Sequence, residues 1–287
     1  MNNKVIMLKK DNNDVFFKYI KNKNIETYYK VKKENFLFRL ARKFKLPLFY
    51  IFLGNWTKEI KRYQKIIMFD NGFNDMVAKY VKSKNKNIKT VLWYWNPISE
   101  YSKQFLSSPY VDEFWTYNRT DALQYGINYN TQFYTKEVKL EDKKQKNDIV
   151  FLGSAKQRKH KIVEIEEVLK KNNLKTNFKI VENKSDYISY DEYLKLIQDS
   201  KCVLDYNMYD LDALTLRPLE ALFLKRKLIT NNINIINYDF YNPKNIFILG
   251  KDDINYIKNF IDTEYEPVKE EIVDYYDYES WIKRFGV

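Results

Sequence analysis

The sequence predicts an α/β protein built from two successive domains, each with a parallel sheet. Short apolar segments rich in β-forming residues alternate with amphipathic helical segments along almost the whole chain. Residues 136–147 carry eight charges in twelve positions without apolar periodicity, as is typical of a linker. With 287 residues, 45% of them hydrophobic, the chain is long enough for two cores of ordinary size.

The predicted strands fall into two sets, one on each side of this linker. The first set is 4–8, 25–31, 65–69, 90–95, 113–117 and 129–134. The second set is 148–152, 177–181, 202–205, 228–230 and 246–249. Between strands, residues 156–171 show apolar positions at helical spacing. We therefore expect an N-terminal domain over 1–140, a C-terminal domain over 146–265 and a helical tail over 266–287.

Composition excludes several classes of protein. Cys202 and His160 are the only cysteine and histidine, so the sequence offers no disulfide framework and almost no zinc-ligand pattern. A reducing, cytoplasmic setting is therefore expected, with His160 as a polar surface group. Only six glycines occur, and neither G-x-x-x-x-G-K-[ST] nor G-x-G-x-x-G is present. P-loop NTPases and ordinary Rossmann dehydrogenases are therefore disfavoured.

The net charge of +12 is concentrated at the start of the chain. Residues 1–65 hold 17 basic and 5 acidic residues, whereas the remaining 222 residues hold 33 of each. Such a distribution favours a nucleic acid or an anionic membrane as partner. The longest apolar run, 48–53, is too short to span a bilayer, so we expect a soluble protein that meets a membrane only from its surface.

Residues 34–46 form a basic amphipathic segment ahead of Pro47. Leu37, Leu40, Ala41 and Phe44 recur at helical spacing, and the surrounding basic residues are Arg39, Arg42, Lys43 and Lys45. One interpretation is contact of residues 30–65 with an anionic membrane surface. The other is a helix packed on the N-terminal sheet with solvated lysines. Both interpretations stay open.

Open α/β sheets bind ligands where their strands end, so charged and polar residues at the strand ends are the candidate site residues. After the strand 202–205, a helix is expected to begin near Thr215, with Pro218 in its first turn. Free amides at that helix start and the charge of Arg217 favour a phosphate, and Glu220 lies one turn further on. The alternative is a surface ion pair between Arg217 and Glu220.

The strand 148–152 runs into a second such place. Gly153 permits close approach of a ligand to the backbone, and Ser154, Lys156 and Arg158 follow it. The two cations are suited to balance a diphosphate. The alternative is an ordinary turn between strand and helix with solvated lysines.

Two further places end strands of the N-terminal domain. Asp70 follows the strand 65–69 and is a candidate general base, with Asp75 and Glu100 as weaker ones, unless Asp70 or Asn71 caps the next helix. The strand 90–95 ends in aromatic residues whose rings are suited to stack on a sugar or a base, with an amide beside them. These acceptor candidates are Trp93, Trp95 and Asn96. Core packing is the alternative for the tryptophans.

The stretch 210–231 resembles the donor-site helix of GT-B glycosyltransferases. Asp212 and Glu220 match an acidic residue, seven others and a glutamate, and residues 227–231 match the strand that follows. With residues 93–98, 113–117 and 215–222, the chain is similar to bacterial transferases that build lipopolysaccharide or capsule. The resemblance covers roughly residue 65 to the C terminus. It departs from the family at Ala213 and Thr215, which replace the usual glycines.

The resemblance implies two Rossmann-like domains facing a cleft, with the helix over 275–285 returning to the first domain. It implies an EC 2.4 glycosyltransferase that needs neither metal nor cofactor and moves a sugar from a nucleotide-activated donor to a glycan or lipid-linked acceptor. The donor residues would be Gly153, Ser154, Lys156, Arg158, Asp212, Thr215, Leu216, Arg217 and Glu220. Asp70 would act as base only in an inverting enzyme. The setting would be cytoplasmic, on the inner face of the bacterial membrane where it is peripheral.

Three other functions compete with this interpretation. A nucleic-acid-binding protein fits the isoelectric point of 9.3, but no recognition helix, zinc or RNP-type pattern occurs in the sequence. A catalytically silent GT-B-like partner subunit fits the fold equally well, although Arg217 and Glu220 are present. A GT-B-like epimerase or phosphorylase is the third, and the basic N-terminal region favours a transferase over it.

Overall fold

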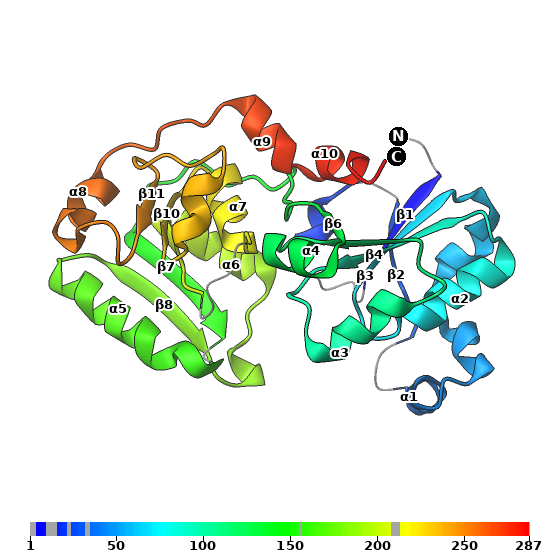
Figure 1. The fold of residues 1–287 in the computed structure, drawn as a ribbon. Coiled ribbons are helices and arrows are strands. Elements are labelled where there is room, and N and C mark those ends of the chain that lie inside the picture. The colour runs from blue at the N-terminus through cyan, green and yellow to red at the C-terminus, as the bar shows by residue number, and fades with distance from the viewer. Residues whose placement is uncertain are drawn as a thin grey trace. The chain divides into compact units, whose positions relative to one another are not determined.

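A computed structural model of the chain describes residues 4–9, 16–21, 24–31, 35–154, 156–207 and 213–286. The chain divides into two compact units. Unit 1 comprises Met1–Thr131 and Ile282–Val287, and unit 2 comprises Gln132–Trp281. Each unit contains one parallel sheet covered by helices (Figure 1). The predicted α/β class with two parallel sheets is therefore confirmed.

Unit 1 contains a six-stranded sheet in the order β2-β1-β3-β4-β5-β6, in which every neighbouring pair is parallel. Every strand overlaps a segment that the sequence predicted. The strands are β1 (Val5–Lys9), β2 (Ile25–Thr27), β3 (Lys65–Phe69), β4 (Lys89–Tyr94), β5 (Glu113–Thr116) and β6 (Asn128–Tyr129). The predicted strands 25–31 and 129–134 are shorter in the structure because pairing with a neighbouring strand stops at Thr27 and at Tyr129.

Helix α2 (Asn74–Lys84) buries an apolar stripe in the core of this unit. Alternate strand residues such as Leu8, Met68 and Leu92 share a core with Val77 and Ala78. The helices are α1 (Phe36–Lys43), α2 (Asn74–Lys84), α3 (Glu100–Lys103) and α4 (Arg119–Tyr125), with 3-10 turns at Phe17–Tyr19, Pro47–Phe52, Asn55–Arg62 and Gln104–Ser107. Asn35 caps α1, since its Oδ1 accepts from the amide of Phe38 at 2.9 Å.

Unit 2 contains a five-stranded parallel sheet in the order β11-β10-β9-β7-β8. Its strands are β7 (Asn147–Ser154), β8 (Thr176–Val181), β9 (Ser200–Asp205), β10 (Lys227–Thr230) and β11 (Ile246–Ile248). The strand order reverses between β7 and β9, because β8 lies on one side of β7 whereas β9, β10 and β11 follow on the other. The crevice of a doubly wound sheet is therefore expected at the carboxyl ends of β7 and β9. The same relation holds between β1 and β3 in unit 1.

Helices lie on both faces of the unit 2 sheet (Figure 1). Phe151 and Leu204 point to the face covered by α5 and α8, whose Ile162 and Ile257 join the same core. Helices α6 and α7 contact β9 as well. The helices are α5 (Lys159–Lys171), α6 (Tyr190–Gln198), α7 (Leu216–Phe223), α8 (Ile257–Asp262), α9 (Glu270–Tyr276) and α10 (Tyr278–Lys283), with 3-10 turns at Lys156–Arg158, Lys184–Asp186, Ile233–Asn237 and Ile254–Tyr256.

The tail expected over 266–287 is divided between the two units. Helix α9 belongs to unit 2, where the Tyr276 hydroxyl donates to Asp239 Oδ1 at 2.6 Å. The chain belongs to unit 1 from Ile282 onward. There the rings of Phe285 and Trp115 lie 4.7 Å apart.

Candidate functional site

The candidate site lies in unit 2, at the switch point between β7 and β9. One glycine and three charged residues lie together there: Gly153 at the end of β7, Asp205 at the end of β9, Arg158 before α5 and Arg217 in the first turn of α7. The carboxyl ends of parallel strands share one edge of a sheet, which is why residues 153 and 217 can meet. The sequence predicted Gly153, Arg158 and Arg217 here, but it did not single out Asp205.

Arg217 connects three elements through its guanidinium group. Its Nη1 lies 3.6 Å from Oδ1 of Asp205, and its Nη2 donates to the carbonyl oxygen of Leu152. The guanidinium carbon lies 5.5 Å from the centre of the Phe151 ring, a cation–π contact. The buried Nε has no hydrogen-bond partner among the described residues.

Asp205 organises the polar side of this site. Its carboxylate is completely buried and accepts from the Thr215 hydroxyl at 3.1 Å and from Nδ2 of Asn207 at 3.0 Å. Asn207 and Asn231 in turn form two hydrogen bonds between the loops that follow β9 and β10. Asp205 could have been found from the sequence because it ends the apolar run 202–204. A charged side chain in such a buried position is unfavourable without a partner.

A second guanidinium group lies beside the first. Arg158 donates through Nε to the carbonyl oxygen of Ser154 at 3.1 Å and through Nη1 to that of Tyr206. A Cβ built on Gly153 would lie 2.9 Å from Nη2 of Arg158 and 3.1 Å from Nη2 of Arg217, so both groups flank the glycine. Burial, and then the charge of Arg217, lower the pKa of Arg158. Arginines remain charged in proteins, so two cations lie here beside the Asp205 carboxylate, and the buried Glu220 carboxyl acts on Arg217 as well.

The start of α7 adds backbone donors to the same place. Thr215 is the N-cap residue, but its hydroxyl donates to Asp205 and no side chain caps the helix. Leu216 and Arg217 therefore present first-turn amides without a side-chain acceptor, and Pro218 has no amide hydrogen. Two predicted donor residues cannot be placed: Asp212 lies outside the described residues, as does the side chain of Lys156.

Glu220 lies deeper than the sequence suggested. It is only 1% exposed, and its Oε1 and Oε2 accept from the hydroxyls of Tyr190 and Tyr193 at 2.8 and 3.1 Å. The Tyr190 hydroxyl lies a further 2.6 Å from that of Tyr134. Burial raises the pKa of Glu220. The surface ion pair with Arg217 that was the alternative is wrong, since Glu220 is buried. A ribose contact would require release of a tyrosine, so that role stays a prediction.

In unit 1, Asp70 ties the ends of two strands together. Its Oδ1 accepts from the amide of Trp95 at 2.9 Å, and its own amide donates to the carbonyl oxygen of Trp93 at 3.0 Å. The start of α2 is held instead by Asn71, whose Oδ1 accepts from the amide of Phe73 at 2.8 Å. Phe73 is the N-cap residue of α2 and no side chain caps the helix, so the capping alternative holds for neither Asp70 nor Asn71. Asp70 stays a half-buried carboxylate at the switch point of unit 1, and its role as base stays a prediction.

The three predicted acceptor residues differ in exposure. Trp93 is completely buried and packs 4.8 Å from the ring of Phe69, so core packing describes it and it cannot contact an acceptor. Trp95 is half-buried and stacks on Phe69 at 5.2 Å, and Asn96 is exposed. Strand alternation placed the two tryptophans on one face, but it could not show that Phe69 covers the first.

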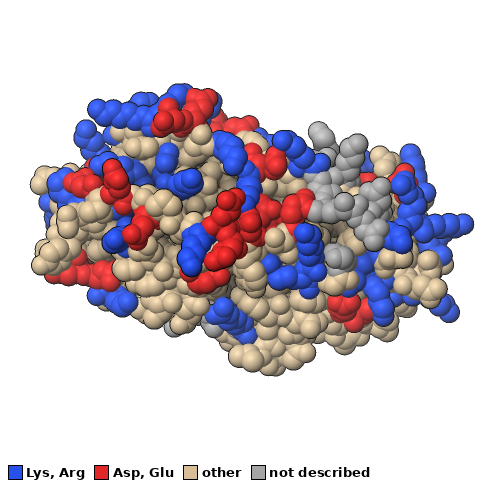
Figure 2. Space-filling model, turned by 90° about the horizontal axis from the view of Figure 1, so that it is seen from above, with Lys and Arg blue, Asp and Glu red and all other residues tan. Residues whose placement is uncertain are grey.

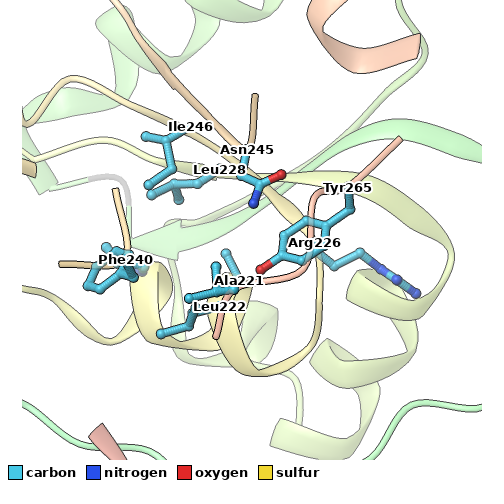
Figure 3. A pocket seen from close by; sticks show the side chains of 10 residues that line it. Ala221, Leu222, Arg226, Leu228, Phe240, Asn245, Ile246 and Tyr265 are labelled. Carbon is cyan, nitrogen blue, oxygen red and sulfur yellow. The ribbon is translucent and has the colours of Figure 1, made fainter. Parts of the chain in front are cut away.

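An apolar crevice on another side of α7 has no room for a ligand. It encloses only about 10 Å³, which is about the space of one water molecule. Its walls come from α7, β10, β11 and the loop before α9 (Figure 3), and they include Ala221, Leu222, Leu228, Phe240, Ile246 and Tyr265. We assign it no function.

Neither a metal-binding cluster nor a helix able to cross a membrane occurs in the part of the chain that the structure describes. No group of three or more His, Cys, Asp or Glu side chains there is arranged to hold a metal ion. None of the helices within the described ranges has the length and apolar character that crossing a bilayer requires. His160 is exposed in the first turn of α5, as expected for a polar surface group.

Comparison with known proteins places the chain in no family. No family model matches the sequence, and no curated protein matches it. Among solved structures, a chain of the Glycosylation Associate Protein (Gap123) complex from Streptococcus agalactiae is similar, with a TM-score of 0.37 and 12% sequence identity. The match covers 76% of this chain and 49% of that one, so this chain spans about half of its length. A similarity of this extent carries no argument about function.

Proposed function

We propose that the chain is a glycosyltransferase of the GT-B type whose unit 2 binds the diphosphate of a nucleotide-activated sugar. The observation that carries this proposal is the pair Arg158 and Arg217 beside Gly153, with the Asp205 carboxylate 3.6 Å from Nη1 of Arg217. The uncapped start of α7 adds amide donors to the same place. A diphosphate carries the charge and the number of acceptor oxygens that such a site satisfies.

The arginines would act on the leaving group. In the transfer, an acceptor hydroxyl oxygen forms a bond to the anomeric carbon of the sugar, and the bond from that carbon to the diphosphate oxygen breaks. The electron pair leaves with the nucleoside diphosphate, whose growing negative charge Arg158 and Arg217 stabilise without a metal ion. In an inverting reaction, the hydroxyl proton passes to Asp70. The acceptor would be a glycan or lipid-linked glycan of a bacterial surface polysaccharide.

Thermal stabilisation by nucleotides tests this proposal. The protein is heated with a panel of nucleoside diphosphates, nucleotide sugars and the matching nucleosides, in the presence of a metal chelator. At a hundredfold excess over the Kd, a bound nucleotide adds about 2.7 kcal/mol to the free energy of unfolding, a clear rise in Tm. A shift with a diphosphate but not with its nucleoside supports the anion site. Failure of the entire panel to shift the Tm refutes it.

A catalytically silent partner subunit is the second candidate. The observation that favours it is the burial of Glu220, which is only 1% exposed and accepts from two tyrosine hydroxyls, so that a ribose has no access to it. Such a subunit would not release nucleoside diphosphate from any donor in the presence of glycan acceptors. Measured turnover that Arg217→Ala abolishes would exclude this candidate.

A nucleic-acid-binding protein has less support. On the face drawn in Figure 2, basic and acidic side chains are interspersed over unit 2, with no continuous basic stripe. A binding assay with random RNA and DNA at low salt separates this candidate from the transferase. Tight, salt-dependent binding there together with an absent nucleotide shift would favour it.

A further inference from the structure

Exposed apolar side chains are concentrated in one short segment of unit 1. Fifteen large apolar residues are exposed in the part of the chain that the structure describes, and seven of them lie between residues 36 and 51. They are Phe36, Leu37, Leu40, Phe44, Leu46, Leu48 and Ile51, with exposures from 38% to 72%. A contiguous apolar surface of this kind marks an interaction site rather than ordinary surface composition.

Helix α1 has a second apolar face that fixes it to the sheet. Phe38 and Ala41 are buried, and the Phe38 ring packs 5.5 Å from that of Phe52. Packing in the core of unit 1 therefore accounts for Phe38 and Ala41, and it divides the four apolar residues that the sequence placed at one helical spacing. Leu37, Leu40 and Phe44 are exposed, so this packing does not account for them.

The charge around this outer face has one sign. Residues 35–52 contain four basic and no acidic residues. Arg39, Lys43 and Lys45 are exposed, whereas Arg42 is half-buried with its guanidinium carbon 4.5 Å from the centre of the Phe73 ring. Three exposed cations thus border the apolar side chains. We refer to residues 36–51 as the α1 surface.

We propose that the α1 surface docks on an anionic lipid bilayer, lying in its interface without crossing it. Leu37, Leu40 and Phe44 would enter the boundary between headgroups and acyl chains, and the three cations would lie among lipid phosphates. A protein partner fits less well, because lysine is depleted in protein interfaces. Lysine and arginine beside an apolar face suit a membrane, since their stems lie on the acyl boundary and their charges stay in water. This proposal does not depend on the glycosyltransferase activity.

Vesicle sedimentation tests the charge requirement. The full chain is mixed with phosphatidylcholine vesicles, either pure or containing about a third phosphatidylglycerol, at low and at physiological salt. We expect binding to the anionic vesicles, weakened by salt, and at least about tenfold weaker binding to the neutral ones. Absence of binding to anionic vesicles even at low salt overturns the proposal.

Variants locate the contact on the α1 surface. Arg39→Gln/Lys43→Gln/Lys45→Gln and Leu37→Ser/Leu40→Ser/Phe44→Ser should each weaken vesicle binding at least about tenfold. Leu123→Ser, at a residue 86% exposed in α4, and Lys251→Gln are the matched controls and should bind like the wild type. All four proteins are first checked for an unchanged Tm. Equal binding by the triple variants and the controls refutes the assignment to this surface.

Insertion is measured separately at position 44. The only native cysteine, Cys202, is buried, so Phe44→Cys can be labelled selectively with an environment-sensitive fluorophore. A blue shift of the emission on anionic vesicles, absent from the same label at Leu123→Cys, would show that the α1 surface enters the bilayer. An unshifted emission from a protein that sediments with vesicles would mean attachment elsewhere and would refute the proposal.

Discussion

Arg217 Nη1 lies 3.6 Å from Oδ1 of Asp205, which joins the first turn of α7 to the end of β9. The same guanidinium group donates to the carbonyl oxygen of Leu152 on β7, so it spans the switch point of unit 2. Asp205 is held in place by Thr215 and Asn207, and it therefore orients the arginine. The relationship fixes donors in advance of a ligand, which lowers the entropy that binding would otherwise cost.

Arg217→Ala should weaken binding of nucleoside diphosphates by about tenfold to a hundredfold. A hydrogen bond to a charged group is worth roughly 1.5–3 kcal/mol, and each 1.4 kcal/mol is a factor of ten. Titration calorimetry of the variant and the wild type measures the difference. Arg62→Ala, at an exposed arginine paired with Glu59, is the control and should bind normally. Normal affinity of a folded Arg217→Ala protein would contradict the site.

Gly153→Ala should disturb both cations at once. The added Cβ would meet Cζ of Phe151 at 2.8 Å and Nη2 of Arg158 at 2.9 Å, distances that force the side chains to move. Overpacking of this kind destabilises proteins by roughly 1–3 kcal/mol, and we expect nucleotide affinity to fall with it. Chemical denaturation and calorimetry report the two effects. Ser83→Ala, at an exposed serine of α2, is the control, and equal behaviour of the two variants would contradict the packing argument.

Glu220→Gln should change how stability depends on pH. Burial raises the pKa of Glu220 above 4.5, its ordinary value, so the folded state holds a proton that the unfolded state has lost. The stability that the folded state draws from a protonated Glu220 is complete below pH 4.5, and it is lost as the pH rises through the folded-state pKa of this carboxyl group. The variant cannot ionise, so its free energy of unfolding should gain on that of the wild type as the pH rises above 4.5. Denaturation of both proteins at several pH values measures the gap, and a constant gap would contradict the raised pKa.

Apolar runs predicted the fold because the central strands are buried on both faces of their sheets. Runs such as 65–69 and 202–205 are interior strands, each with a parallel neighbour on both sides in its own sheet. The positions of Gly153 and Arg217 were predicted because the carboxyl ends of parallel strands lie at one edge of the sheet. Sequence patterns were therefore sufficient where a residue's role depends on its own element.

Side-chain contacts between different helices and strands could not be predicted from the sequence. Glu220 is covered by Tyr190 and Tyr193 of α6, and no spacing within α7 could indicate them. Trp93 packs against Phe69 of the neighbouring strand. Alternation along β4 had placed Trp93 and Trp95 on the same face and therefore predicted the same exposure for both. In both cases the local pattern fixed the face of the element, and packing from another element decided whether the side chain reaches solvent.

Asp70→Asn separates a base from a structural carboxylate. Asparagine can still accept from the amide of Trp95, so the end of β3 should keep its geometry and the Tm should change little. If Asp70 takes the acceptor proton, kcat should fall by about a hundredfold to ten-thousandfold while the affinity for the nucleotide stays the same. Turnover with a donor identified in the nucleotide panel measures this. Glu271→Gln, at a carboxylate 77% exposed at the start of α9, is the control. An equal, small effect in both variants would remove Asp70 from the chemistry and leave it the role of joining β3 to β4.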